Sequence, residues 1–370
     1  MAEKTLKSRI KDYLPVSVAR WYLKKRSFAT GFKATGYDDS CTIKPQDSKY
    51  KNIISIQGFN YSGSGAVLDM LREYPVISVL GYLDTEVHKG DKATKGMKLS
   101  EIDIIRLSGG LFEIEKYLDS DNHFFNDALL NRTVKCFESS SLYRYSEEIR
   151  DLLYRFFANI TSLRIENLDQ PYYNGYLVGL NEIPDIYFLK KMSKDEYYEL
   201  CKNLLTSIFN AFYQNGKEYL AADQLLSDHE YNYTRNKSYI PNLKTILVPR
   251  DPRDTYAWAV KKNLPQMEHN TVERFITWFK NMYVNVNPTE EKVGCQIVRY
   301  ENLVLDYDNQ EKKINTYLEL ESADHQLRQQ IFNPAFSKRF VGIYKNMKGY
   351  ERDFDIIREE LSLYCNPLID

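Results

Sequence analysis

The sequence of 370 residues has little cysteine and little histidine, and neither residue type is clustered. Its five cysteines are an odd number, and no two lie close together in the sequence, which argues against a disulfide framework and against a zinc site. The five histidines show no metal-ligand spacing either. We therefore expect a protein of the cytoplasm without a disulfide framework or a zinc site.

Long apolar stretches and a strong net charge are also missing. No apolar run approaches the ~18 residues of a membrane-spanning helix, and the first residues lack the apolar core of a signal peptide. The net charge of −1 gives no reason to expect nucleic acid as a partner. Hydrophobic residues make up 43% and charged residues 27% of the chain, which is typical of a globular protein with a sizeable core.

The first 36 residues are an exception, because they are strongly basic. They carry nine Lys and Arg against two acidic residues, and the stretch 14–28 is amphipathic with one Trp and one Tyr. Such a segment can lie on an anionic membrane surface, here the cytoplasmic face, or it can pack as a basic arm on its own domain. We predict an N-terminal arm over residues 1–45, with peripheral membrane contact through 1–36 as one of these two roles.

Predicted strands alternate with predicted helices in the remainder of the chain, which indicates an α/β fold with a central parallel sheet. The apolar runs predict strands over 52–59, 74–82, 217–223 and 294–304, and a strand–turn–helix unit over 242–260. Between about 90 and 215 the apolar residues recur with a helical period instead. The clearest predicted helices there are 111–119, 146–160 and 193–216. We expect one domain over 46–370 with a large helical insertion at about 90–215.

A turn rich in glycine and serine follows the first predicted strand, with the sequence GFNYSGSG over 58–65, and a helix-like pattern comes next. Strand, glycine-rich turn and helix N-terminus together are a common phosphate-binding arrangement. The backbone N–H groups of residues 63–66 can converge on one anion, to which the helix dipole adds positive potential. The sequence therefore predicts a P-loop-type three-layer fold, although the lysine of a nucleotide-triphosphate loop is missing. A turn without any ligand is the alternative.

Two further segments carry cations suited to phosphate. Residues 250–254 read Arg-Asp-Pro-Arg-Asp after an apolar strand, so Arg250 stands at the carboxyl end of that strand, where ligands bind in parallel sheets. Its guanidinium can hold a phosphate with two parallel hydrogen bonds, and Asp254 can cap the helix that follows. The basic loop over 336–350 can close over a polyanion. The alternatives are a turn whose charges pair with one another and a solvated loop.

Together these segments resemble the motifs of the sulfotransferase superfamily, in particular its bacterial carbohydrate-type members, which use 3'-phosphoadenosine-5'-phosphosulfate (PAPS). Residues 58–65 stand in place of the loop that wraps the 5'-phosphosulfate, and 250–254 match in full the motif whose first Arg holds the 3'-phosphate. Tyr-Glu-Asn at 300–302 is similar to a motif whose Tyr lies near the adenine. Residues 337–346 keep the Lys, the Gly and the Lys-Asn end of a last motif. The four motifs occur in the family's order.

The resemblance covers about 50–85 and 217–365, and it implies a PAPS site formed by eleven residues. These are Tyr61, Ser62, Gly63, Ser64, Gly65, Ala66, Arg250, Trp258, Tyr300, Lys338 and Arg339. Three of them depart from the family's pattern. Tyr61 stands where the family has a cation near the leaving phosphate, Gly65 where it has a hydroxyl, and Trp258 where it has a serine.

The charge that Tyr61 lacks must come from another residue if the site is to turn over, because sulfuryl transfer builds negative charge on the leaving phosphate. We expect a lysine from elsewhere to supply it, either Lys135, Lys217 or Lys338, and take Lys338 as the catalytic lysine. Two alternatives stay open. The Tyr61 phenol can donate a hydrogen bond in place of the cation, or the site binds without turnover.

Transfer also needs a base that takes the proton of the acceptor hydroxyl. The resemblance implies that this base lies shortly after the second strand, where Asp84, Glu86 and His88 occur. Glu86 is the expected catalytic base, and Asp84 and His88 are alternatives that are otherwise expected to contact the acceptor. Asp223 and Gln224 are further candidates for the acceptor site, at the end of a strand that we expect beside the strand of Arg250. Loop residues and a helix cap are the structural alternatives.

The sequence thus predicts a PAPS-dependent sulfotransferase that needs no metal. By analogy with the family, the acceptor is the hydroxyl of a carbohydrate or glycolipid, as in polysaccharide biosynthesis. A nucleotide-binding scaffold protein with a decayed site is an alternative, supported by Tyr61 and Trp258. A P-loop kinase is a weaker one, because without the loop lysine nothing holds the β- and γ-phosphates.

Overall fold

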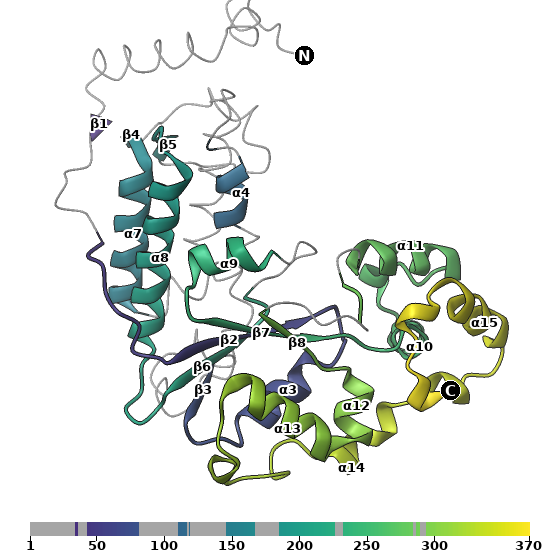
Figure 1. The fold of residues 1–370 in the computed structure, drawn as a ribbon. Coiled ribbons are helices and arrows are strands. Elements are labelled where there is room, and N and C mark those ends of the chain that lie inside the picture. The colour runs from purple at the N-terminus through teal and green to yellow at the C-terminus, as the bar shows by residue number, and fades with distance from the viewer. Residues whose placement is uncertain are drawn as a thin grey trace, which may run out of the picture. The chain divides into compact units, whose positions relative to one another are not determined.

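The structure is a computed structural model that describes residues 34–35, 43–80, 110–116, 118, 146–166, 185–225, 232–283, 286–288 and 294–370. The chain divides into two compact units (Figure 1). Unit 1 comprises Met1–Gln46 and Gly109–Leu204, and unit 2 comprises Asp47–Ser108 and Leu205–Asp370. Most of the predicted basic arm, including its proposed membrane contact, lies outside the described residues, and the predicted domain boundary at 45/46 stays a prediction. None of the described helices is long and apolar enough to cross a bilayer.

Unit 2 is built on a five-stranded sheet with the strand order β3-β6-β2-β7-β8, in which all neighbours are parallel. The strands are β2 (Asn52–Gly58), β3 (Ile77–Leu80), β6 (Tyr219–Asp223), β7 (Leu243–Val248) and β8 (Cys295–Ile297). All seven residues of β2 are buried, as expected for a central parallel strand covered on both faces. The predicted α/β fold with a central parallel sheet is confirmed.

One face of this sheet is covered by α3 (Ser64–Leu71), α12 (Tyr300–Leu305) and α13 (Tyr307–Leu318). Their buried residues pack on Ile54 and Ile56 of β2 in one apolar core. In Figure 1, α3 and α13 lie below the sheet, and α9 (Tyr233–Tyr239) lies above it.

A second apolar core joins α10 (Pro252–Lys262), α11 (Val272–Met282) and α15 (Glu351–Glu360) to Phe59 and Leu247 of the sheet region. It is rich in aromatic rings, and Phe59 packs on Tyr283 with ring centroids 4.2 Å apart. Phe59 belongs to the glycine-rich loop and Leu247 to β7, so this core fixes two of the predicted site segments to the same body of the molecule.

A buried ionic cluster ties the end of α3 to the segment that leads into the basic loop. The Glu73 carboxylate bonds Nε2 of His325 at 2.7 Å, while Nδ1 of His325 bonds Glu311. Glu73 also accepts three backbone N–H groups, from Gln329, Ile331 and Phe332, at 2.8–3.0 Å. A fully buried carboxylate is tolerated when it is paired and hydrogen-bonded in this way. The cluster fixes the path of residues 325–332 before α14 (Pro334–Ser337).

Unit 1 contains the predicted helices and an antiparallel sheet. The helices are α4 (Leu111–Lys116), α7 (Glu147–Ile160) and α8 (Lys194–Ala211), of which α8 crosses into unit 2. The sheet has the order β1-β4-β5, with β1 (Ala34–Thr35), β4 (Thr161–Glu166) and β5 (Asp185–Leu189). Helix α7 starts where Ser146 Oγ accepts the N–H of Ile149, a regular N-cap.

Three expectations about the helices and strands are wrong. The helix expected to reach Gly216 ends at Ala211, and Gly216 lies in the turn beyond it with φ +81°. The strands β4 and β5 were not expected within the insertion. The strand expected over 294–304 is only three residues long, and α12 begins at Tyr300.

Candidate phosphate-binding site

The loop between β2 and α3 has an unusual backbone conformation. Asn60 and Tyr61 have φ values of 31° and 60°, and Gly63 has φ 98°. Ser62 Oγ accepts the N–H of Phe59 at 2.9 Å and so closes the turn from inside. Left-handed conformations at residues other than glycine cost on the order of 1–3 kcal/mol and cluster at ligand sites. The loop is therefore shaped by the surrounding structure and not by local preference alone.

Two glycines of this loop are required by close packing. A Cβ on Gly58 would lie 2.7 Å from the Cβ of Ser64, and a Cβ on Gly63 would lie 2.3 Å from Cδ2 of Tyr300. Gly65 differs, because no atom of the described residues lies within 4 Å of the place where its Cβ would be. The backbone at Gly65 is thus open to a ligand.

Three of the four expected N–H groups of this loop are available to an anion. The N–H of Ala66 donates to the carbonyl oxygen of Gly63 at 2.9 Å, so Ala66 is already used within the turn. Within the described part of the chain, no acceptor is found for the N–H groups of Gly63, Ser64 and Gly65. They belong to the start of α3, where the helix dipole favours negative charge.

Arg250 connects the loop to the other predicted site segments. It follows β7 and is only 6% exposed. Its Nη1 donates to the carbonyl oxygen of Tyr61 at 3.2 Å, and its Nη2 donates to that of Phe340 at 2.6 Å. The guanidinium lies over the ring of Tyr300 at 5.0 Å. Its Nε is buried as well, and no hydrogen-bond partner for it is found among the described residues.

Tyr300 is a packing residue at the same place. It is the first residue of α12, it is 6% exposed, and its hydroxyl donates to the carbonyl oxygen of Ser337 at 3.5 Å. Burial raises the pKa of the phenol, so the hydroxyl stays protonated. The ring lies between Gly63 and Arg250 and holds the two against each other.

Asp254 fixes the basic segment to α10. Its carboxylate accepts the N–H of Gly342 at 2.7 Å and that of Tyr344 at 3.2 Å. Burial raises the pKa of this carboxyl to about 6, while the nearby Arg250 lowers it. The residue that caps α10 is Asp251, whose carboxylate accepts the N–H of Arg253, so the cap expected at Asp254 is wrong.

Lys338 and Arg339 lie on the exposed side of the basic segment, in a 3₁₀ turn over Lys338–Phe340. The Arg339 guanidinium lies over the ring of Phe336 at 3.5 Å. For the Lys338 ammonium, no ion pair or hydrogen bond is found within the described ranges.

Trp258 packs against the same segment, because its ring contacts Phe340 edge-to-face, with ring centroids 5.7 Å apart. Trp258 thus contributes packing at the place where the family has a serine.

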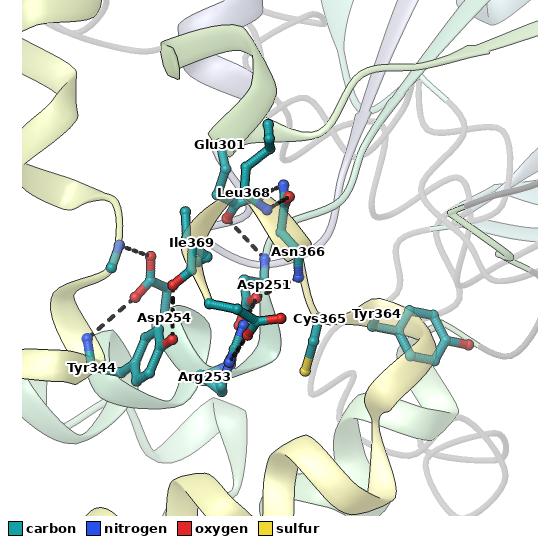
Figure 2. A network of polar contacts seen from close by, with 12 residues as sticks. Asp251, Arg253, Asp254, Glu301, Tyr344, Tyr364, Cys365, Asn366, Leu368 and Ile369 are labelled. Atoms are coloured by element: carbon teal, nitrogen blue, oxygen red, sulfur yellow. Dashed lines mark hydrogen bonds and ion pairs between the residues drawn. The ribbon is translucent and has the colours of Figure 1, made fainter. Parts of the chain in front are cut away.

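A buried network surrounds Asp251, the residue after Arg250 (Figure 2). Asp251 is fully buried, and its carboxylate accepts Nε and Nη2 of Arg253 at 3.0 and 2.8 Å. The Asp251 N–H donates to Glu301 at 2.9 Å. Burial and the Asp251 charge raise the pKa of Glu301 to about 7. The Arg253 guanidinium reaches the Asp370 carboxylate as well. Sequence reasoning missed the roles of Arg253 and Glu301, although both lie within recognised motifs.

The remaining expected residues lie elsewhere in unit 2. Lys217 precedes β6 at the amino end of the sheet, where its ammonium donates to the carbonyl oxygens of Pro75 and Ile77 at 2.6 and 3.3 Å. Burial lowers its pKa, and it is placed away from the carboxyl ends of the strands. Asp223 is the last residue of β6, which pairs with β2 and β3, and Gln224 follows it. The expectation that this strand adjoins the strand of Arg250 is wrong, because β2 lies between them.

Four expected residues fall outside the described residues, namely Asp84, Glu86, His88 and Lys135, and their roles stay predictions. In the described part of the chain, no group of three His, Cys, Asp or Glu side chains is placed to hold a metal ion.

A cavity of about 650 Å³ lies between α10, α11 and α15, lined by residues such as Tyr256, His269 and Asp353. None of the expected site residues lines it.

No family model and no curated protein matches this sequence. Among solved structures, the chain is similar to a sulfotransferase from Mycobacterium avium, with a TM-score of 0.37 and 12% identity over 85% of this chain and 77% of that one. It is also similar to the sulfotransferase domain of the Synechococcus olefin synthase, with a TM-score of 0.35 and 11% identity over 88% and 98%. A retinol dehydratase in complex with androsterone and the inactive cofactor PAP matches with a TM-score of 0.26 and 11% identity over 86% and 72%.

These neighbours agree with the family that the motifs resemble.

Proposed function

We propose that this protein is a sulfotransferase that moves a sulfuryl group from PAPS to the hydroxyl of an acceptor. The observation that carries the proposal is the position of Arg250. Its guanidinium bonds the loop after β2 and the basic segment, and it lies against Tyr300. Three motifs that a PAPS site requires in the family thus lie within hydrogen-bonding or ring-contact distance of Arg250, which belongs to the fourth.

The residues at this place fit a donor with a phosphate at each end. The N–H groups of Gly63, Ser64 and Gly65 would hold the 5'-phosphosulfate end, with Ser62 fixing the turn beneath them. Arg250 would hold the 3'-phosphate, because it is the first Arg of the motif at 250–254 and a guanidinium can bind a phosphate with two hydrogen bonds. Arg339 lies on the exposed side of the neighbouring segment and can screen the same charge. When bound, PAPS supplies the sulfuryl group.

Lys338 is proposed as the cation that the Tyr61 position lacks. It is exposed, it lies two residues from the Phe340 carbonyl that Arg250 bonds, and Lys217 is already engaged at the opposite edge of the sheet. A lysine there would stabilise the negative charge that builds up on the leaving phosphate. Lys135, which lies outside the described residues, stays an alternative.

Acceptor and base are proposed from the sequence. Glu86 would take the proton from the acceptor hydroxyl, with Asp84, His88, Asp223 and Gln224 in contact with the acceptor. The proposed acceptor class is a carbohydrate or glycolipid in polysaccharide biosynthesis, and the proposed location is the cytoplasm.

The donor site is tested with 3',5'-adenosine bisphosphate (PAP), the desulfated product, by calorimetry. We expect Arg250→Ala to weaken PAP binding by roughly 10- to 100-fold, because a charge-assisted contact with a phosphate is lost. Arg274→Ala is the matched control, since Arg274 is an exposed arginine whose ion pair with Glu268 lies on the surface. It should bind PAP as the unmodified protein does.

Two results would contradict the proposal. If PAP does not bind, or if Arg250→Ala binds it unchanged, the site is not a PAPS site.

Two other results would favour the alternative functions. Equal binding of ATP and PAP would favour a kinase. PAP binding without any transfer to a panel of saccharides would favour the nucleotide-binding scaffold protein.

The role of Lys338 is tested by turnover with radiolabelled PAPS and an acceptor from that panel. We expect Lys338→Ala to lower kcat by about 100-fold or more while PAP affinity changes only a few-fold, because the lysine acts on charge that develops during transfer. The control is Lys312→Ala, an exposed lysine on α13 outside the four motifs, and it should keep its kcat. Full turnover of Lys338→Ala would transfer the role to another residue.

A further inference from the structure

The last residues of the structure, 363–370, lie directly against the Arg250 turn. The backbone N–H of Asn366 donates to the Asp251 carboxylate at 2.7 Å. The Asn366 side chain donates to Oδ1 of Asn302 at 2.7 Å and to the Glu301 carboxylate at 3.3 Å. The same side chain accepts the N–H of Leu368 at 3.0 Å. Asn366 is 1% exposed, so these contacts are shielded from water.

Other residues hold this segment from two sides. The Arg299 guanidinium donates to the carbonyl oxygens of Leu363, Tyr364 and Cys365 at 2.9–3.3 Å. The hydroxyl of Tyr344 donates to the carbonyl oxygen of Ile369 at 3.0 Å. The segment therefore spans from the start of α12 to the basic segment, past the turn that carries Arg250 (Figure 2).

The contacts matter because two buried acids meet at this turn. Asp251 and Glu301 are both fully buried, and the only direct link between them is the Asp251 N–H that donates to Glu301. A buried carboxylate is costly unless donors satisfy its oxygens. Asn366 gives one donor to each of the two acids, and Arg253 gives the others to Asp251. Without the Asn366 side chain, Glu301 would have one donor fewer beside Asp251, while the backbone N–H at position 366 would still donate to Asp251.

We propose that residues 363–370 position Arg250, with Asn366 as the residue that links the segment to both acids of the turn. Asn366 then acts on the donor site through Asp251 and Glu301, without touching a ligand. The statement about ligand binding rests on the proposed function, whereas the statement about the turn does not.

The turn is tested first, by hydrogen–deuterium exchange of the full chain without any ligand. Asn366→Ala removes the side-chain bonds to Glu301 and Asn302 and keeps the backbone N–H that donates to Asp251. Arg299→Gln releases the segment from its other side. In both variants we expect amides of 249–257 to exchange about tenfold faster relative to those of β2. Asn309→Ala is the control, because the side chain of Asn309 makes an exposed contact with Asp306 on α13. It should leave both regions unchanged.

The exchange data can overturn the proposal in two ways. Unchanged exchange at 249–257 in both variants would show that the turn does not need the segment. An equal increase at 249–257 and in β2 would show that the segment stabilises the unit as a whole and does not position the turn.

Affinity for PAP is the second readout. We expect both variants to bind PAP roughly three- to tenfold more weakly, which corresponds to the loss of one or two hydrogen bonds that hold Arg250 in place. Faster exchange with unchanged PAP affinity would contradict the positioning of Arg250 for the ligand. If the unmodified protein does not bind PAP, the proposed function fails, and the exchange result still decides whether the segment holds the turn.

Discussion

Both the backbone conformation and the packing at position 63 require a glycine. Its φ of 98° favours glycine, and the ring of Tyr300 occupies the space where any Cβ would lie. Gly65, two residues later, is under neither constraint, because open space surrounds it and its φ is not in the left-handed region. Besides Gly58, the loop thus contains one glycine that the structure requires and one that leaves the backbone accessible.

The two glycines should respond differently to the same substitution. We expect Gly63→Ala to lower the free energy of unfolding by about 1–3 kcal/mol and to abolish PAP binding, because the loop or Tyr300 must move. Gly65→Ala should change the free energy of unfolding by no more than about 0.5 kcal/mol. Urea unfolding measures both. Equal effects of the two substitutions would contradict this account of the loop.

Tyr61 shows why a departure from the family's pattern can leave the fold of a loop intact. The side chain is 51% exposed, and the contact that Arg250 makes at this position is with the backbone carbonyl oxygen. The structural role of the position is therefore independent of the side chain. The chemical role of a cation is a separate requirement, and for this reason we assign it to Lys338.

At the scale of elements, the sequence predicts well what is continuous in the chain. The unit of strand, glycine-rich loop and helix over β2 and α3 has a local pattern, and so does the apolar strand that ends at Arg250. In the sequence TSLRIE of β4, polar and apolar residues alternate, which indicates a strand. The segment lies between stretches with a helical period, and for this reason the strand was not predicted.

What the sequence does not predict is how elements contact one another. Strands β6 and β7 follow each other in the chain, but β2 separates them in the sheet, and no local pattern records that order. Asp254 holds the basic segment through backbone N–H groups of Gly342 and Tyr344, which any residue type would supply. No local sequence pattern indicates a role for Asn366 either, because its contacts are with Asp251 and Glu301, which are distant in the sequence.

At the scale of the whole molecule, two buried acids should make stability depend on pH. Burial is the main cause that raises the pKa of Glu301 to about 7 and that of Asp254 to about 6. The folded protein then binds these protons more tightly than the unfolded chain does. The stabilisation is complete below the ordinary pKa values near 4 and is lost as the pH rises through about 6 and 7.

We expect the loss to be visible as a difference between variants. Between about pH 5 and about pH 8, the unmodified protein should lose about 1–3 kcal/mol of unfolding free energy more than Glu301→Gln does, because the glutamine cannot titrate. Urea unfolding across this range measures the difference. The control is Glu359→Gln, on the exposed face of α15, which should follow the unmodified protein. Parallel curves for Glu301→Gln and the unmodified protein would contradict the assignment.

The contact between Trp258 and Phe340 has an optical consequence. Trp258 is one of three tryptophans in the chain, and its indole is partly buried against the residue whose carbonyl oxygen bonds Arg250. The emission wavelength of an indole follows the polarity around it, so light emitted by Trp258 reports whether the basic segment is seated on α10. With Trp21 and Trp278 replaced by phenylalanine, Trp258 is the tryptophan that remains, and it reports on the proposed donor site without an attached dye.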